Sequence, residues 1–541
     1  MGGGRMYDYK FINARIVDGT GNPWFRGEIG VKDGKIVSVS KNLEGESLHV
    51  IDAEHQIVCP GFIDVHTHDD LAVISNPDHE PKLFQGVTSE VLANCGFGCA
   101  PVNKLTRKQL LQYISPVLGT YSREWGWKSF KEYVSVLSER STSMNLVSQV
   151  AHGAVRIAVM GFESRPATSQ EIEEMKALVE EAMQAGAIGL SLGLLYAPGC
   201  YADRAELIAL SKVAARYGGI LNCHMRAEGD SLLESMNEVF DIAEAAEIPL
   251  HISHLKLIGV NNWGKIHHAL EWIESKKAQG LDVTCDIYTY TAGSSTLMSI
   301  LPSWVSEGGV EKALMRLSNP KQRAKIKNDM GRSVKGWDNF VEMLGWDRVV
   351  VSAVNGEANT NKAIEGMNFL EIAEHRKQEP VECLMDLLLE EQGCVTMILH
   401  QMSEEDVKAV LRSDYSMIGS DGLPLSSEKI HPRHFGTFPR LLSKYVRDEK
   451  VMPLQQAIRK MTSFSAQRFG FKRRGIVQEG YFADLVVFNE QEIRDRATFE
   501  KPRQYPDGIK YVMVNGRLVA RHNHKTAERP GVFVPLQYKC C

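Results

Sequence analysis

The chain has 541 residues, enough for one large domain with an accessory or for two to three domains. Its formal net charge of −5 provides no positive field for nucleic acid or anionic lipid, which excludes these as main partners. Hydrophobic residues at 43% and charged residues at 24% are values of a folded globular protein and exclude a disordered or fibrous chain.

The N-terminal stretch MGGGRMYDYKF lacks the apolar core of a secretory signal, and no stretch reaches the roughly 18 apolar residues of a membrane span. Met6 stands where a myristoylation motif needs Ser or Thr, and the terminal KCC is no prenylation box. We therefore predict a cytoplasmic protein without a membrane partner. Its ten cysteines are expected to be reduced thiols that fill the core or bind metal.

Two β-rich segments bracket the chain. In residues 1–58, alternating patterns such as YDYKFINARIV and IGVKDGKIVSV flank a hairpin signal at Asp33-Gly34. Residues 476–541 repeat the pattern in ADLVVF and in IKYVMVNGRLVARH, which contains a second hairpin signal. Neither segment is long enough to bury a core alone, so we expect both chain ends to form one small β-sandwich.

Between these ends, residues 59–475 alternate between strand and helix patterns. The apolar runs AIGLSLGLL, LDVTCDIY and DRVVVSAV alternate with helix-period stretches such as SQEIEEMKALVEEAMQAG. This order predicts an α/β fold with a parallel sheet, and its length favours a (β/α)8 TIM-like barrel over an open sheet, although periodicity alone does not separate the two. Residues 292–345 break the rhythm and predict an insertion near the barrel mouth.

The first polar cluster follows the strand-like run VCPGFIDVHTHDD. Residues i and i+2 of a strand point to the same side, so His66 and His68 can face one point at the carboxyl end of a barrel strand, where active sites of this fold lie. The alternative is two surface histidines. Cys95 ends the next strand-like run, either as a thiolate suited to zinc or as a buried core thiol.

Three further residues end later apolar runs. His224 and His254 are separated by 30 positions, about one βα unit, so they can occupy equivalent places on neighbouring strands. His251 lies within its strand and is interpreted as structural. Asp421, in GSDG, is either part of a turn or a carboxylate at the top of the last strand. One shared site explains these placements better than four separate accidents.

Taken together, HTHDD, NCGFG, GLLYAPG, HMRAEG, ISHLK and GSDG resemble the N-acyl-D-amino-acid deacylase (D-aminoacylase) family of the amidohydrolase superfamily, over nearly the whole chain. The resemblance implies zinc-dependent hydrolysis of the amide bond of N-acyl-D-amino acids to a carboxylate and a free D-amino acid. The D configuration comes from the resemblance alone.

The resemblance also implies one tightly bound zinc, held by Cys95, His224 and His254, and a weaker second site bordered by His66 and His68. The carboxylated lysine that bridges two metals in many superfamily members has no counterpart in AIGLSLGLLY, and Cys95 can supply the missing anionic ligand. A zinc with three protein ligands leaves a position for a water whose pKa falls to about 7.

Asp421 is then expected to take the proton of that water and to return it to the leaving amine, while neutral His66 or His68 assists at the carbonyl. By the same resemblance, Lys256 binds the substrate carboxylate, with Tyr288 as the favoured partner. Further candidates for this end of the substrate are Tyr196, Tyr290, Arg226 and Arg433, each of which could equally be a core hydroxyl or a surface ion pair.

Family members that act on acidic side chains carry an extra arginine near the start of the insertion, and residues 293–305 contain none. We therefore predict a neutral or apolar side-chain preference, with Leu297, Met298 and Ile300 as lining. Two alternatives stay open. A cyclic-amide hydrolase of the dihydroorotase or hydantoinase type would usually need the absent lysine, and a non-catalytic scaffold of this fold would lose ligands that this chain keeps.

Overall fold

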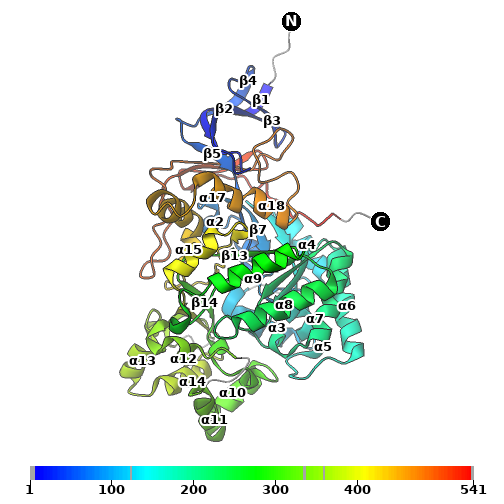
Figure 1. Cartoon of the computed structure of the whole chain (residues 1–541), viewed down its shortest axis with the longest axis vertical. Helices are drawn as coiled ribbons and strands as arrows, with labels where there is room; N and C mark the ends of the chain where they lie inside the picture. The colour runs from blue at the N-terminus through cyan, green and yellow to red at the C-terminus, as the bar shows by residue number, and fades with distance from the viewer. Residues whose placement is uncertain (1–5, 122–124, 333–336, 357–359, 538–541) are drawn as a thin grey trace.

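The structure is a computed structural model, and it describes residues 6–121, 125–332, 337–356 and 360–537 (Figure 1). At its centre, six parallel strands form a sheet in the order β17-β13-β12-β11-β10-β9, and three form a second sheet, β6-β7-β8. These strands are β6 (Phe62–Asp64), β7 (Val87–Leu92), β8 (Asn145–Ser148), β9 (Val150–Ala151), β10 (Gly189–Gly193), β11 (Ile220–His224), β12 (Leu250–Ile252), β13 (Val283–Ile287) and β17 (Ser416–Ile418).

The two sheets meet at both of their ends. A single residue, Gln149, separates β8 from β9, and a parallel bridge between Thr67 and Gly422 joins the segments that follow β6 and β17. The arrangement is TIM-barrel-like α/β, as the alternation of patterns predicts. The bridge matters for function because it brings the first and last strand ends, which carry polar residues, side by side.

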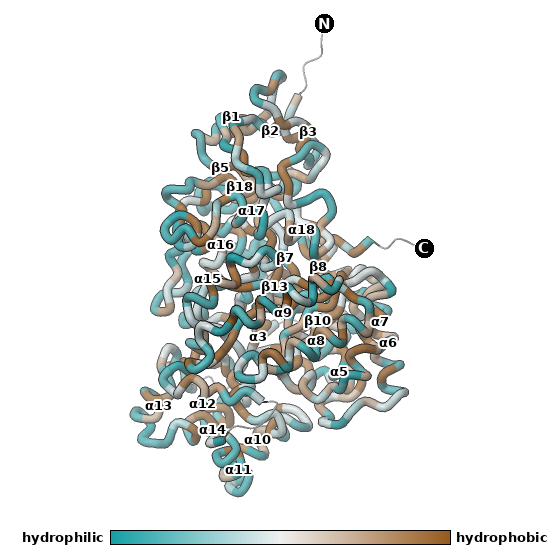
Figure 2. Tube along the Cα trace, in the orientation of Figure 1, coloured by the Kyte–Doolittle hydropathy of each residue, from teal (hydrophilic) through white to brown (hydrophobic). Residues whose placement is uncertain are grey.

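Helices follow the strands and cover them on the outside (Figure 1). In α6 (Ser169–Gln184), which confirms the predicted helix, a capping box joins Thr168 to Glu171, and the buried residues recur at helical spacing. Figure 2 shows such helices alternating between hydrophilic and hydrophobic positions. The others around the strands are α1 (Ala72–Ser75), α2 (Glu80–Leu83), α3 (Arg107–Leu118), α4 (Phe130–Glu139), α5 (His152–Met160), α7 (Arg204–Arg216), α8 (Leu232–Ala246), α9 (His267–Ala278), α15 (Glu404–Arg412), α16 (Arg433–Arg440), α17 (Leu454–Met461) and α18 (Ser463–Arg468). Within the described part of the chain, no helix is both long and apolar enough to cross a bilayer.

The two chain ends share one nine-stranded sheet. Its strands are β1 (Met6–Ile16), β2 (Phe25–Lys32), β3 (Lys35–Ser40), β4 (Glu46–Asp52), β5 (Ile57–Pro60), β18 (Leu485–Phe488), β19 (Ile509–Val514), β20 (Arg517–Arg521) and β21 (His524–Lys525). Antiparallel pairing of β5 with β18 joins the two ends, and residues of both, such as Phe11 and Leu485, share one core. The predicted hairpin between β2 and β3 is present, with positive φ at Asp33 and Gly34.

The insertion is larger than the sequence predicts. Three antiparallel strands in the order β14-β16-β15 pack with helices around a core of their own, at the end of the molecule opposite β1–β4 (Figure 1). The elements are β14 (Ala292–Thr296), α10 (Val310–Ser318), α11 (Pro320–Met330), α12 (Phe340–Leu344), β15 (Val349–Val354), α13 (Phe369–Arg376), α14 (Pro380–Glu390) and β16 (Val395–His400). The run DRVVVSAV therefore belongs to this antiparallel sheet, and its prediction as a parallel central strand is wrong, because a buried apolar run does not reveal its pairing partner.

Candidate active site

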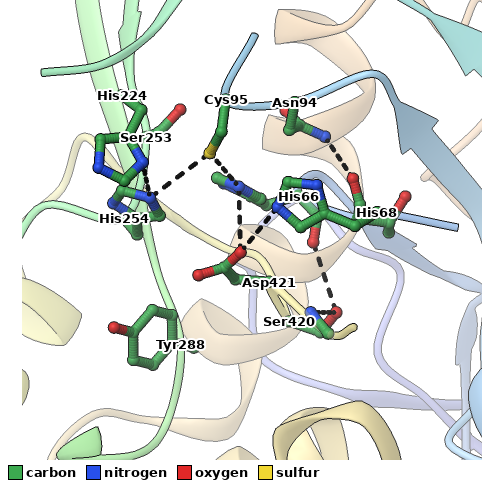
Figure 3. A network of polar contacts seen from close by, with 12 residues as sticks. His66, His68, Asn94, Cys95, His224, Ser253, His254, Tyr288, Ser420 and Asp421 are labelled. Carbon is green, nitrogen blue, oxygen red and sulfur yellow. Dashed lines mark hydrogen bonds and ion pairs between the residues drawn. The ribbon is translucent and has the colours of Figure 1, made fainter. Parts of the chain in front are cut away.

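Six predicted side chains gather where parallel strands end (Figure 3). Each comes from the carboxyl end of a strand or from the few residues after it, and all six are buried. In chain order they are His66 and His68 after β6, Cys95 after β7, His224 at the end of β11, His254 after β12 and Asp421 after β17. The structure thus brings together residues that are up to 355 positions apart in the chain.

The Cys95 thiol lies among three imidazoles. His66 Nε2 is 3.1 Å from Cys95 Sγ, and His254 Nε2 is 3.5 Å from the same sulfur. His254 Nε2 is also 3.0 Å from His224 Nδ1. Burial alone would raise the pKa of the Cys95 thiol, but the charges of the imidazoles outweigh it and hold this pKa well below its usual value. The sulfur is therefore poised as a thiolate.

Three of the site residues have left-handed backbone conformations. The φ angles of Cys95, His254 and Asp421 are 54°, 34° and 50°. Non-glycine residues adopt this region at a cost of roughly 1–3 kcal/mol each, and such strain clusters at functional sites. The surrounding structure therefore holds each side chain in a specific direction at the strand ends.

Asp421 faces both histidines of the HTH motif and an arginine. Its Oδ1 lies 3.0 Å from His68 Nε2 and 3.4 Å from His66 Nε2, and its Oδ2 lies 2.8 Å from Arg433 Nη1. Burial would raise the pKa of this carboxyl group, but Arg433 and His66 outweigh burial and hold the pKa well below its usual value. Asp421 is therefore a carboxylate that can accept a proton.

Glu228 is a member of the site that the sequence analysis misses. Lys256 Nζ donates to Glu228 Oε1 at 2.7 Å, and the same oxygen lies 3.1 Å from His254 Nδ1. Burial raises the pKa of Glu228, but Lys256 and His224 outweigh it and lower the pKa to about 2. A carboxylate behind a metal-ligand imidazole fixes the orientation of its ring. The available signal was its place in HMRAEG, four residues after His224.

Asp286, at the end region of β13, is a second missed residue. Its Oδ2 lies 3.1 Å from His66 Nδ1 and 3.0 Å from His251 Nε2, while His251 Nδ1 is 2.8 Å from Thr284 Oγ1. All four residues are buried. His251 thus sits within the strands, as the interpretation of a structural histidine requires, and Asp286 orients the His66 ring.

A pocket opens over this cluster and is lined by side chains of both the strand ends and the insertion. Among the predicted substrate-binding residues, Lys256, Tyr196 and Tyr288 line it. The Tyr196 hydroxyl lies 2.8 Å from Ser295 Oγ of the insertion, and the Arg433 guanidinium lies 4.6 Å from the centre of the Tyr288 ring. The insertion therefore forms one wall of the pocket.

Other predicted residues lie elsewhere. Arg226 forms an ion pair with Glu238 at 2.9 Å and donates to the carbonyl oxygen of Cys200 at 2.7 Å, and it does not line the pocket. Leu297 and Ile300 are fully buried in the core of the insertion. Sequence position alone could not separate these residues from Met298, which lines an adjoining cavity.

The donor set fits a metal ion. Cys95, His224 and His254 each offer one ligand atom, and these atoms lie within 4.8 Å of one another. His66, His68 and Asp421 take part in two further groups of the same kind. The buried atoms His224 Nε2 and His68 Nδ1 have no hydrogen-bond partner within the described ranges. One thiolate with two imidazoles is a ligand set that suits zinc and leaves a coordination position free.

Comparison with protein-family models identifies the family of this chain. The model of the amidohydrolase family matches residues 49–520. The chain belongs to the amidohydrolase family. The match spans the strand ends that carry the site as well as the insertion, so the family assignment covers the elements that build the pocket.

Two curated relatives and a solved structure narrow the assignment within the amidohydrolases. The chain is 34% identical to D-aminoacylase of Alcaligenes xylosoxydans xylosoxydans, over 97% of both chains, and 30% identical to N-acyl-D-aspartate deacylase of the same organism, over 97% of this chain and 94% of that one. The crystal structure of N-acyl-D-glutamate deacylase from Bordetella bronchiseptica, complexed with zinc and a phosphonate mimic of the tetrahedral intermediate, superposes with a TM-score of 0.83 at 30% identity, covering 98% and 100% of the chains. The predicted family resemblance is confirmed.

Proposed function

We propose that this amidohydrolase hydrolyses the amide bond of N-acyl-D-amino acids, giving a carboxylate and a free D-amino acid. The single observation that supports this most is the convergence of Cys95, His224, His254 and Asp421 at one pocket. Relatives with this activity in their names cover almost the whole chain. Arrangement of a thiolate, imidazoles and a carboxylate around one point suits hydrolysis of a linear amide.

The residues that would hold zinc tightly are Cys95, His224 and His254, and His66 and His68 border a second, weaker site. Zinc, when bound, lowers the pKa of a water and polarises a substrate carbonyl. Glu228 and Asp286 hold the His254 and His66 rings from behind. The protein's own contribution is thus a preset arrangement of ligands whose rings cannot turn freely.

Asp421 is the proposed proton carrier. Its carboxylate accepts a proton from the attacking water and delivers it to the nitrogen of the scissile amide, which must be protonated before the amine leaves. Arg433, which is fully buried and 2.8 Å from Asp421 Oδ2, positions this carboxylate rather than the substrate. His68, 3.0 Å from the other oxygen, restricts it on the opposite side.

Lys256 and Tyr288 are proposed to bind the substrate carboxylate. Both are buried, and both line the pocket. The Lys256 ammonium already contacts Glu228, so it is held in place before the substrate arrives. Tyr196, packed against His224 with ring centres 4.8 Å apart, is proposed to close the pocket beside the zinc ligands.

A neutral or apolar substrate side chain is the proposed preference. A second cavity adjoins the pocket and shares Leu195, Tyr196 and Ser299 with it. Apolar residues including Met298 and Trp337 line this cavity, and none of its described lining residues is charged. An acidic side chain would lose hydration there without gaining a cation.

This preference predicts a higher kcat/KM for N-acetyl-D-methionine than for N-acetyl-D-glutamate, by about tenfold or more, because burying an unpaired carboxylate costs several kcal/mol. Introducing a cation with Met298→Arg should narrow the ratio, whereas the same change at exposed Met315 should leave it unaltered. Faster turnover of the acidic substrate by the unmodified enzyme would refute the preference.

Several finer statements belong to the same proposal. The central strands are proposed to form a closed (β/α)8 barrel within residues 59–475. The two chain ends, residues 1–58 and 476–541, are proposed to form a β-sandwich. Cytoplasmic location and the absence of nucleic-acid or membrane partners remain predictions from composition.

The alternatives are less favoured. Cyclic-amide hydrolysis of the dihydroorotase type usually uses a bridging lysine, and β10 contains none. A non-catalytic scaffold would not need to keep three ligand types at one point with a carboxylate beside them.

The proposed function is tested by removing the metal with a chelator. Hydrolysis of N-acetyl-D-methionine should disappear after chelation and return when Zn²⁺ is added. The Cys95→Ala variant should not regain activity with Zn²⁺. Hydrolysis that continues both after chelation and in the Cys95→Ala variant would contradict the proposed function.

A further inference from the structure

A second polar cluster lies outside the catalytic pocket, among Asp69, His79 and His434. Each residue offers one possible ligand atom, and these atoms lie within 4.8 Å of one another. None of the three lines the pocket over Cys95. Asp69 follows β6, His79 precedes α2, and His434 is the second residue of α16, so the cluster joins three separate segments.

The three side chains are almost completely buried, with exposed fractions of 0%, 2% and 4%. Even so, Asp69 Oδ1, His79 Nε2 and His434 Nδ1 have no hydrogen-bond partner among the residues that the structure describes. Buried polar atoms are nearly always satisfied in folded proteins, and leaving one unsatisfied costs roughly 1–3 kcal/mol. The residues that carry these atoms also bring one possible ligand atom each to within 4.8 Å of one another, which indicates a ligand that they bind together.

The backbone of His79 supports this reading. Its φ angle is 44°, a left-handed conformation that histidine adopts at a cost. This conformation accompanies a side chain whose Nε2 lies 3.5 Å from Asp69 Oδ2 and whose ring centre is 5.7 Å from that of His434. The strained backbone thus goes with a side chain turned toward the cluster.

The charges around the cluster favour a cation. Asp64, Asp69, Asp70 and Glu90 are fully buried, and in the described part of the chain both carboxylate oxygens of Glu90 lack a hydrogen-bond partner. The buried ammonium of Lys82 faces two of these carboxylates: it donates to Asp64 Oδ2 at 2.6 Å and lies 3.1 Å from Asp69 Oδ2. Asp64 and Asp69 share this one ammonium, which leaves a negative charge beside the cluster that a cation would balance.

We propose that Asp69, His79 and His434 bind a divalent transition-metal ion that is separate from the catalytic metals. Two imidazole nitrogens and one carboxylate oxygen suit zinc, cobalt, nickel or iron, whereas calcium and magnesium prefer oxygen ligands alone. Lys82 lies 3.1 Å from Oδ2 of Asp69, and among the described residues neither oxygen of this carboxylate has a hydrogen-bond partner. The proposal does not depend on the identity of the substrate.

The ion would act as a structural clamp behind the catalytic residues. Asp69 directly follows His68 in the chain, and His434 Nδ1 lies so near Gly422 that a β-carbon added there would be 2.8 Å from it. His68 and Asp421, which precede these positions, contact each other in the active site. Fixing Asp69 to His434 therefore fixes the two loops that carry that contact.

The number of metal ions bound per chain tests the proposed site at Asp69, His79 and His434. Full-length protein is stripped with chelator and reloaded with Co²⁺; cobalt per chain is measured by mass spectrometry, and the thiolate-to-cobalt absorption band reports the Cys95 site independently. We expect His79→Leu and His434→Leu each to bind about one cobalt fewer than the unmodified chain, with the absorption band unchanged. His49→Leu, at an exposed histidine, should match the unmodified chain.

Equal cobalt content in the unmodified chain and both variants would overturn the proposal and leave a cluster neutralised by Lys82 and protons. A second measurement does not depend on how the variants fold. Crystals of the unmodified cobalt-loaded protein should give an anomalous-scattering peak between His79 and His434. A peak at Cys95 without one at this position would equally overturn the proposal.

Discussion

At the scale of single residues, the site depends on the directions in which its side chains point, and the residue types alone do not determine these directions. Strand-end positions of His66, Cys95, His224 and Asp421 could be predicted because an apolar run followed by a polar residue marks where a strand ends. The left-handed conformation of Cys95 could not, since cysteine does not favour a positive φ, and the preference of aspartate for this region is too weak to single out Asp421.

The residues that contact the metal ligands from behind were harder to predict than the metal ligands themselves. Glu228 and Asp286 contact the histidines from behind, and the place of Glu228 four residues after His224 is too weak a signal to separate it from a surface carboxylate. For Arg226 the sequence left a substrate role and an ion pair open, and the fold pairs it with Glu238.

Asp421→Asn tests the proton carrier. The amide keeps the shape of the side chain but cannot accept a proton, so we expect kcat for N-acetyl-D-methionine to fall by about 10²–10⁴-fold, the usual contribution of general acid–base catalysis. Occupancy at Cys95, read from the thiolate-to-cobalt band, should not change. Asp507→Asn, at an exposed carboxylate, serves as the matched control. An Asn variant with normal kcat would remove Asp421 from the mechanism.

At the scale of elements, the close approach of two strand ends positions the thiolate. β10 ends in Gly193, and a β-carbon there would lie 2.0 Å from the carbonyl oxygen of Cys95. Only glycine lets the loop after β7 approach so closely. The sequence shows the glycine, but the backbone that it meets comes from a distant segment and could not be predicted.

Gly193→Ala should therefore displace the loop that carries Cys95. We expect at least about tenfold weaker zinc binding and a loss of roughly 1–3 kcal/mol in the free energy of unfolding, as for other overpacked core sites. Chelator competition and urea unfolding measure these two quantities. Gly331→Ala is the control, because its β-carbon would have no contact nearer than 3.6 Å. Unchanged zinc affinity in Gly193→Ala would contradict this account of the loop.

At the scale of the whole molecule, the order of elements along the chain predicted the central α/β part and the union of the two ends, because parallel strands need helical crossovers and short β segments need a shared core. The extent of the insertion was not predictable in the same way. Its strand β15 has the composition of a central strand, and only the antiparallel pairing with β16 reveals where it belongs.

One contact couples the C-terminal segment to the central part. Arg529 donates to both oxygens of Asp78, at 2.6 and 2.9 Å, and Lys525 contacts the same carboxylate. Hydrogen bonds from Arg529 and then Lys525 outweigh burial and lower the pKa of Asp78 to about 2. Because this folded-state pKa lies below the ordinary aspartate value of 3.8, the contact stabilises the fold above about pH 4 and is lost as the pH falls toward 2.

Asp78→Asn should thus lower the free energy of unfolding by about 1–2 kcal/mol at pH 7, a value reduced because the basic partners are partly exposed to solvent. The difference in unfolding free energy between the variant and the unmodified protein should shrink below pH 4. Urea unfolding at several pH values measures it. Asp507→Asn, which removes an exposed pair with Arg494, should change the unfolding free energy far less. A deficit that stays constant down to pH 3 would show that the contact does not act through ionisation.

The central claim is that a metal-dependent site built by Cys95, His224, His254 and Asp421 hydrolyses N-acyl-D-amino acids. The most direct measurement is the release of free amino acid from matched N-acetyl-D-methionine and N-acetyl-L-methionine by the zinc-loaded protein, with Cys95→Ala as the inactive reference. We expect hydrolysis of the D isomer alone, and none by the variant. Preferential hydrolysis of the L isomer, or no turnover of either isomer by a fully zinc-loaded protein, would contradict it.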